Sequence, residues 1–231
     1  MKFKTKLLNF FFPKYCLSCS KLNSYFCQEC FSKVVIEKPA CFICQSRNND
    51  GSLCYFCLYK AGDDNKIFYV DKINWLSLYK NQSLKNLMFF YKYAGLKEIA
   101  KIFATLLFLK IRQTNYLKNS ILVPMAISNL SLKNRTYNQT ELITFYLSSY
   151  LNMKMINGLK IKKFYKKQSD KKAKDRYKNV NQFIWLENDL RNKNIILIDD
   201  IVTSGATLNS AAYSLKKANA KSVSAFVVLK A

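Results

Sequence analysis

The chain has 231 residues, of which half are hydrophobic and 15% aromatic, so it can build one or two cores and is not disordered as a whole. Its 38 basic residues against 14 acidic ones give a net charge of +24, which favours polyanionic partners such as nucleic acid, anionic lipid or phosphorylated small molecules. Because 33 of the basic residues are lysines, an AT-rich genome would explain part of the same excess. The absence of histidine excludes Ser-His-Asp triads, HExxH metalloprotease sites and Cys₂His₂ zinc fingers, and no Gly-rich nucleotide loop is present.

The first twelve residues combine three lysines with a short apolar run at residues 7–12. This run is interrupted by Asn9 and is followed by Pro13 rather than by a small-residue cleavage site, so it does not predict a secretory signal peptide. No apolar run approaches the roughly 18–20 residues that a membrane-spanning helix needs. We therefore expect a retained docking segment and a cytoplasmic protein, either free or peripheral at the inner face of the membrane.

All eight cysteines lie between residues 16 and 57, in four CxxC pairs: Cys16 and Cys19, Cys27 and Cys30, Cys41 and Cys44, and Cys54 and Cys57. Each CxxC turn places two thiolates on one side of a tight loop, and two such turns complete the tetrahedral four-sulfur site that zinc accepts. Eight cysteines make two closed sites, which predicts two structural zinc ions. Iron–sulfur clusters, disulfides and redox-active pairs are the alternatives, and disulfides would need an oxidising compartment.

The spacing between the cysteine pairs is short, with seven residues between Cys19 and Cys27 and nine between Cys44 and Cys54. It favours two consecutive ribbons with one zinc each, although interleaved sharing of the pairs is compatible with it. We expect a double zinc-ribbon module over residues 1–60 whose folding depends on metal, because so short a segment cannot build a core of its own. Such a module could bind nucleic acid, bind a protein or brace a neighbouring domain.

The rest of the chain, residues 61–231, is expected to form an α/β domain after a connector at residues 58–75. Apolar residues recur at intervals of three and four over residues 82–112, which predicts two helices separated at Gly95. A strand at residues 121–123, stopped by Pro124, is expected next, and further elements follow: a helix around residues 142–147 and strands at residues 158–162 and 223–229. Strands alternating with helices predict a parallel sheet.

Residues 160–178 hold ten basic and two acidic side chains, with Phe164, Tyr165 and Tyr177 among them. This composition predicts either a basic loop that closes over an anionic ligand or a nucleic-acid strip with aromatic stacking. A solvated loop kept soluble by its charge is the simpler alternative.

The most informative segment is residues 195–207, IILIDDIVTSGAT. Its four leading apolar residues predict a buried strand, and Asp199 and Asp200 stand at the carboxyl end, where open α/β sheets bind ligands. The acidic pair is followed by a turn that opens a helix through about residue 217, and its backbone amides and hydroxyls would converge on one anion. This predicted anion cradle consists of Thr203, Ser204, Gly205, Ala206 and Thr207. Paired carboxylates beside an anion cradle suit a ligand that carries both a phosphate and a vicinal diol.

This segment resembles the PRPP (5-phosphoribosyl 1-diphosphate) motif of type I phosphoribosyltransferases, and the chain resembles the ComF (ComFC, GntX-like) competence family. Four other stretches resemble motifs of that family in the same order: LLNFFFPKYCLSC at residues 7–19, FYKYAG at 90–95, VPM and RTYNQ between 123 and 139, and QSDKKAKDRYKNVNQF at 168–183. Met125, Thr136 and Tyr137 depart from the family's Pro, Gly and Phe. The resemblance implies a type I phosphoribosyltransferase fold with a parallel sheet, preceded by the zinc-ribbon module.

The resemblance also implies roles for individual residues. Asp199 and Asp200 would bind the ribose hydroxyls, residues 203–207 would hold the 5′-phosphate, and Mg²⁺ would be carried by the pyrophosphate. Other implied site residues are Val123, Pro124 and Met125 in the loop that meets pyrophosphate, Arg135 and Gln139 nearby, and Gln168, Arg176 and Asn179 on or beside a flexible loop.

Two classes of function stay open at this point. The first is an enzyme that transfers phosphoribosyl from PRPP to an unidentified acceptor, with loss of pyrophosphate. The second is a non-catalytic module that senses PRPP or a nucleotide, while its zinc ribbons and basic surface engage single-stranded DNA or a helicase-like competence protein. The resemblance implies a role in handling incoming DNA during natural competence.

Overall fold

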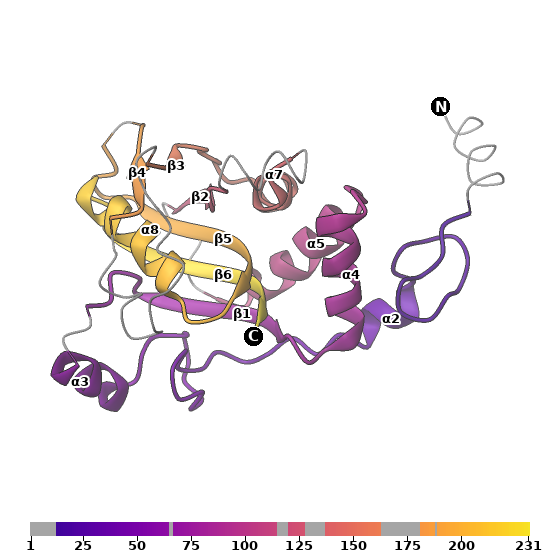
Figure 1. The fold of residues 1–231 in the computed structure, drawn as a ribbon, viewed down its shortest axis with the longest axis horizontal. Helices are drawn as coiled ribbons and strands as arrows, with labels where there is room; N and C mark the ends of the chain where they lie inside the picture. The colour runs from indigo at the N-terminus through magenta and orange to yellow at the C-terminus, as the bar shows by residue number, and fades with distance from the viewer. Residues whose placement is uncertain (1–12, 65–66, 115–119, 128–136, 163–180, 188) are drawn as a thin grey trace.

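The computed structural model describes residues 13–64, 67–114, 120–127, 137–162, 181–187 and 189–231. Its centre is a parallel sheet with the strand order β1 (Lys72–Leu78), β6 (Ser222–Lys230), β5 (Asn194–Val202) and β2 (Ser120–Pro124). Figure 1 shows β5 and β6 side by side at the centre of the molecule. The parallel sheet confirms the predicted α/β class.

A second, antiparallel pair of strands lies outside this sheet: β3 (Leu159–Ile161) and β4 (Phe183–Trp185). The expected strand at residues 158–162 is therefore present, but it does not extend the parallel sheet. The side chains of Leu159 and Phe183 are buried in the same core as α8 (Ala206–Lys217). The strand pair thus helps to cover the face of the sheet on which α8 packs.

Helices cover both faces of the parallel sheet (Figure 1). The helices α5 (Ile99–Arg112) and α7 (Gln139–Leu151) pack on one face, with α4 (Gln82–Tyr93) next to α5, and α8 packs on the other face. Gly95 adopts a left-handed conformation with φ 67° between α4 and α5, as its position in the apolar pattern predicts. Among the described helices, none is both long enough and apolar enough to cross a membrane.

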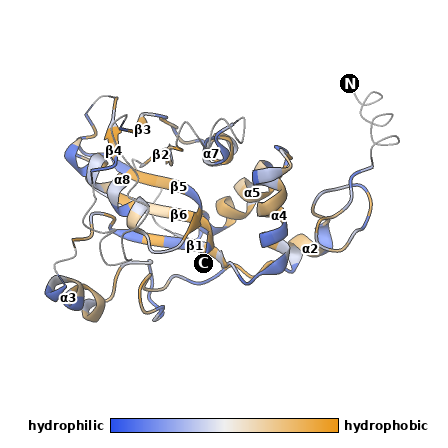
Figure 2. Cartoon of the chain, in the orientation of Figure 1, coloured by the Kyte–Doolittle hydropathy of each residue, from blue (hydrophilic) through white to orange (hydrophobic). Residues whose placement is uncertain are grey.

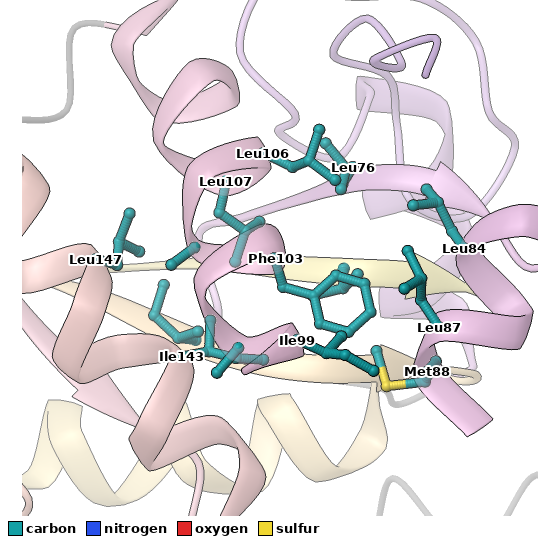
Figure 3. Close-up of a cluster of buried hydrophobic side chains, with 14 of the residues drawn as sticks. Leu76, Leu84, Leu87, Met88, Ile99, Phe103, Leu106, Leu107, Ile143 and Leu147 are labelled. Carbon is teal, nitrogen blue, oxygen red and sulfur yellow. The ribbon is translucent and has the colours of Figure 1, made fainter. Parts of the chain in front are cut away.

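The buried side chains form two cores, one on each face of the sheet. Figure 2 shows that β5 and β6 are among the most hydrophobic segments, because both their faces are covered. Figure 3 shows the core between the sheet and the helices α4, α5 and α7, to which these residues contribute: Leu76, Leu84, Leu87, Met88, Ile99, Phe103, Leu106, Leu107, Ile143 and Leu147.

The expected connector at residues 58–75 was wrong in two places. The helix α3 (Tyr55–Asp63) begins directly after Cys54, so it starts inside a CxxC pair and extends past it. The strand β1 begins at Lys72, inside the expected connector. It carries buried polar side chains, Asn74 and Ser77, among its apolar ones. These polar positions break up the apolar run from which a buried strand is predicted.

Candidate ligand site and metal centres

The acidic pair lies in the second half of β5. The strand continues through Val202, so Asp199 and Asp200 belong to the sheet rather than to the turn that follows it. The backbone N–H of Asp200 donates to Oδ1 of Asp199 at 2.8 Å, and Asp200 is 9% exposed. Loss of solvation on burial, and next the neighbouring charge of Asp200, raise the pKa of Asp199 to about 8.

Lys92 pairs with one of the two carboxylates. Its Nζ lies 2.7 Å from Oδ2 of Asp200, and the side chains of the pair are only 11% and 12% exposed. Lys92 is the penultimate residue of α4 and lies within the FYKYAG stretch. The helix α4 therefore places a cation beside the acidic pair. The sequence singles out the FYKYAG stretch but predicts no role for Lys92.

The turn after β5 has the form expected for an anion cradle. Gly205 is the residue before α8 and has φ 78°, a conformation that other residues resist. The first turn of α8 contains no acidic residue, and Thr203 and Thr207 are exposed. The backbone amides in the first turn of α8 and the exposed hydroxyls can therefore donate to the same anion, although the N–H of Ala206 donates to Oγ of Ser204 at 3.4 Å in this structure.

The end of β2 lies beside the acidic pair, because the backbone N–H of Met125 donates to the carbonyl oxygen of Ile198 at 3.0 Å. The Met125 carbonyl in turn accepts hydrogen bonds from Asn138 at 3.2 Å and from Thr140 at 2.7 Å, at the start of α7. Residues 123–125 and Gln139 are thus brought to the carboxyl end of the sheet, although Val123 and Pro124 belong to the strand β2 rather than to the expected loop.

Gln139 is the first residue of α7, 1% exposed, and neither polar atom of its amide has a hydrogen-bond partner among the described residues. Its backbone carbonyl accepts from the hydroxyl of Tyr91 at 2.7 Å, which links α7 to the helix that carries Lys92. A buried amide without partners costs free energy, so this side chain is suited to meet a polar ligand.

The other predicted site residues lie outside the described residues: Arg135, Gln168, Arg176 and Asn179. The same holds for the basic stretch from residue 163 onward.

The cysteines form two separate four-sulfur groups, the first of Cys16, Cys19, Cys27 and Cys30 and the second of Cys41, Cys44, Cys54 and Cys57. Within each group the ligand atoms all lie within 4.8 Å of one another. The Sγ atoms of Cys19 and Cys27 are 3.5 Å apart, and those of Cys44 and Cys54 are 3.7 Å apart. A tetrahedral zinc with bonds of about 2.3 Å requires sulfurs about 3.8 Å apart, so both groups fit a structural zinc ion.

This grouping decides between the two pairings that the spacing allowed. Consecutive CxxC pairs share a site, and interleaved sharing does not occur. All eight cysteines are free thiols rather than disulfides.

The comparisons with known proteins agree with both parts of the chain. A family described as "Double zinc ribbon domain" matches residues 7–58, and one described as "Phosphoribosyl transferase domain" matches residues 145–231. Competence protein ComFC of Bacillus subtilis is 27% identical over 93% of this chain and 95% of its own length. Competence protein F of Haemophilus influenzae is 30% identical over 52% of this chain and 56% of its own length.

Among solved structures, a hypoxanthine phosphoribosyltransferase from Staphylococcus aureus is 14% identical, with a TM-score of 0.39, over 58% of this chain and 64% of that one. The assignment rests instead on the two domain matches, the similarity to the competence proteins, the two four-cysteine groups and the parallel sheet. The chain is similar to the ComF competence proteins over nearly its whole length, and it carries a double zinc ribbon domain ahead of a type I phosphoribosyltransferase-like domain.

Proposed function

We propose that this protein is a member of the ComF family that binds PRPP at the carboxyl end of β5 and acts in the handling of DNA during competence. One observation carries the proposal: the acidic pair Asp199–Asp200 is followed, within the same chain segment, by the left-handed Gly205 turn at the start of α8. A diol-binding pair and a phosphate cradle on adjoining backbone match a sugar phosphate, whereas either feature alone would not.

Different residues of the described site would bind different parts of PRPP. Asp199 and Asp200 would accept hydrogen bonds from the ribose hydroxyls, and the amides of residues 203–207 would hold the 5′-phosphate. Gln139 and the end of β2 would face the pyrophosphate. Mg²⁺ would arrive on the pyrophosphate oxygens, because it is usually bound by few carboxylates and by substrate phosphates.

Lys92 has a part in this site that does not depend on direct contact with the ligand. Its Nζ lies 2.7 Å from Oδ2 of Asp200, and the two side chains are only 11% and 12% exposed. The ion pair therefore holds the Asp200 side chain in place at the proposed ribose site before the ligand arrives.

The experiment is calorimetric titration of the zinc-loaded protein with PRPP and Mg²⁺, beside a double variant, Asp199→Asn with Asp200→Asn. Micromolar binding by the parent and its loss in the folded double variant would support the proposal. Asp189→Asn is the matched control, because Asp189 is an exposed acid paired with Arg191 away from the cradle. Failure of the folded, zinc-loaded parent to bind PRPP would overturn the proposal.

Transfer of the phosphoribosyl group is the second candidate function, and it builds on the same geometry. The product of such a reaction is pyrophosphate, so release of pyrophosphate from bound PRPP in the presence of candidate nucleophiles is the assay. Water-dependent release alone, or no release with any acceptor, would favour a protein that uses PRPP as a ligand.

The role in competence rests on the relatives' names and on the net charge of +24. We propose single-stranded DNA as the polyanionic partner, with a helicase-like competence protein as a further one. Affinity for an oligonucleotide should fall steeply with salt, because neutralised phosphates release counterions. The Asp199→Asn, Asp200→Asn variant should retain this affinity, and its loss there would show that DNA and PRPP use one surface.

A further inference from the structure

The second zinc ribbon packs against the turn that we propose as the phosphate cradle. Phe42 follows the ligand Cys41 in the chain and is 5% exposed. A Cβ atom on Gly205 would lie 2.9 Å from Cε1 and 3.4 Å from Cζ of the Phe42 ring. The ring edge of Phe42 therefore packs against the one glycine whose left-handed conformation makes the turn.

Lys230 fixes Phe42 in this position. Its Nζ donates to the Phe42 carbonyl at 2.7 Å, and it lies 4.6 Å and 4.4 Å from the ring centroids of Phe42 and Trp75. Lys230 is opposite Val202 in the sheet, and Val202 is the last residue of β5 before the cradle. The backbone of the ribbon is thus tied to the strand end from which the cradle starts.

The remainder of this ribbon is attached to the edge strand β1. The backbone N–H of Ile73 donates to the Gly51 carbonyl at 3.0 Å, and Lys72 pairs with Asp50 at 2.7 Å. Residues 50–52 lie one residue before the second CxxC pair of the ribbon, Cys54 and Cys57. Zinc would join this anchored half to the half that carries Phe42.

The first ribbon has a different neighbour. Its Leu17 carbonyl accepts from Asn86 at 3.4 Å, and the hydroxyls of Ser18 and Ser83 are 2.6 Å apart, so it packs on the amino-terminal half of α4. Cys16 and Phe26 enter the core shared by α4 and α5. No contact of the described part of this ribbon with residues 203–207 is present among these interactions.

We propose that Phe42 is a positioning residue for the phosphate cradle, and that zinc at the second four-cysteine site, Cys41, Cys44, Cys54 and Cys57, keeps the cradle in its binding conformation. The proposal rests on the PRPP site proposed above. Without zinc, the half-ribbon that carries Phe42 loses its link to the half attached to β1 and is held by the Lys230 contacts alone among those described above, so the Phe42 ring is less firmly fixed against Gly205. If the competent turn is then populated in about one molecule in ten, the apparent PRPP affinity falls about tenfold.

The test compares one ligand substitution in each ribbon. Cys19→Ser and Cys44→Ser remove the second cysteine of the first CxxC pair in their ribbons, and both cysteines are exposed. Zinc content confirms the loss of one ion in each variant. We expect PRPP affinity, measured by calorimetry, to fall about tenfold in Cys44→Ser and to stay within about twofold in Cys19→Ser.

Phe42→Ala tests the contact itself with both zinc sites intact, and it should weaken PRPP binding to a similar degree. If Phe42→Ala does not fold, Phe42→Val makes the same test, because it keeps apolar side-chain atoms near the backbone but withdraws the ring edge from Gly205. Unchanged affinity in the folded Phe42 variant would overturn the proposal. Equal losses in Cys19→Ser and Cys44→Ser would also overturn it, because zinc would then act through overall stability.

A readout without ligand separates this inference from the proposed function. Amide hydrogen exchange of residues 203–209 should quicken in Cys44→Ser and in the Phe42 variant, but not in Cys19→Ser. This holds even if the parent protein fails to bind PRPP. Unchanged exchange in Cys44→Ser would refute the coupling whatever the cradle binds.

Discussion

Replacement of Lys92 by Met should leave Asp200 as a poorly solvated charge without its partner. The two side chains are 11% and 12% exposed, and their charged atoms lie 2.7 Å apart. With an effective dielectric constant near 20, two unit charges at this distance attract by about 6 kcal/mol. Desolvation of the two ions consumes several kcal/mol of that attraction, so we expect a net coupling of about 2 kcal/mol.

The assay is a double-mutant cycle of Lys92→Met and Asp200→Asn, measured by urea unfolding of the zinc-loaded protein. Lys92→Met alone should cost about 3 kcal/mol, because it strands the carboxylate, and Asp200→Asn in the same protein should recover most of that cost. The coupling should persist in 1 M salt, since a pair shielded from solvent is screened little.

The pair Lys72–Asp50 is the matched control. Its charged atoms are also 2.7 Å apart, but its side chains are 29% and 39% exposed. A cycle of Lys72→Met and Asp50→Asn should give less than about 1 kcal/mol at low salt and close to zero in 1 M salt. Equal couplings for the two pairs, or a Lys92–Asp200 coupling that vanishes in high salt, would refute the reasoning that burial decides the strength of this contact.

Three further outcomes follow from single contacts. Gly205→Ala should abolish PRPP binding because of its φ of 78° and the approach to Phe42, whereas Gly95→Ala, with φ 67° and open space around it, should cost only the backbone strain of about 1 kcal/mol in urea unfolding. Because the pKa of Asp199 is raised, its stabilising proton is held at acidic pH and lost as the pH rises through about 8. Asp199→Asn should therefore melt several degrees higher than the parent at pH 8.5 and at nearly the same temperature at pH 4. Tyr91→Phe should lower the free energy of unfolding by about 1 kcal/mol, measured by urea titration, because it removes the hydrogen bond to the Gln139 carbonyl.

Features encoded within a short stretch of sequence were predicted well. The turn at Gly205 needs a left-handed residue between a buried strand and a helix, and all three signals lie within residues 195–217. The zinc sites use consecutive CxxC pairs, so spacing alone favoured the pairing that the structure shows. The break between α4 and α5 at Gly95 was also predicted from a short stretch of sequence.

The contacts that complete the site join residues far apart in the chain. Lys92 meets Asp200 across more than one hundred residues, and Phe42 meets Gly205 across an even longer interval. Neither side chain is unusual in its local sequence: one is a lysine among 33, and the other is an aromatic beside a metal ligand. Only the order of strands in the sheet, with β1 and β6 on one side of β5, brings them to the same end.

The strand β1 shows why part of the architecture escaped prediction. It lies at the edge of the sheet, yet its side chains are buried, Leu76 in the core with α4 and α5 and Ile73 and Trp75 in the core with α8, while residues 51–52 of the second ribbon bond to its outer edge. The amide of Asn74 donates to the Asp50 carbonyl at 3.1 Å, so a polar residue in the middle of the strand serves the contact with the ribbon. A pattern that reads as an interrupted apolar run is in fact an interface between two parts of the chain.

The two ribbons therefore support different parts of the same domain. The first packs on α4, the helix that delivers Lys92 from its far end, and the second packs under the cradle and along β1. A cysteine-rich module without a large core of its own gains stability from these contacts, and the second ribbon gives the turn at Gly205 a packed neighbour. If the proposal for Phe42 holds, this division is the route by which a zinc module would act on the proposed ligand site at the end of β5.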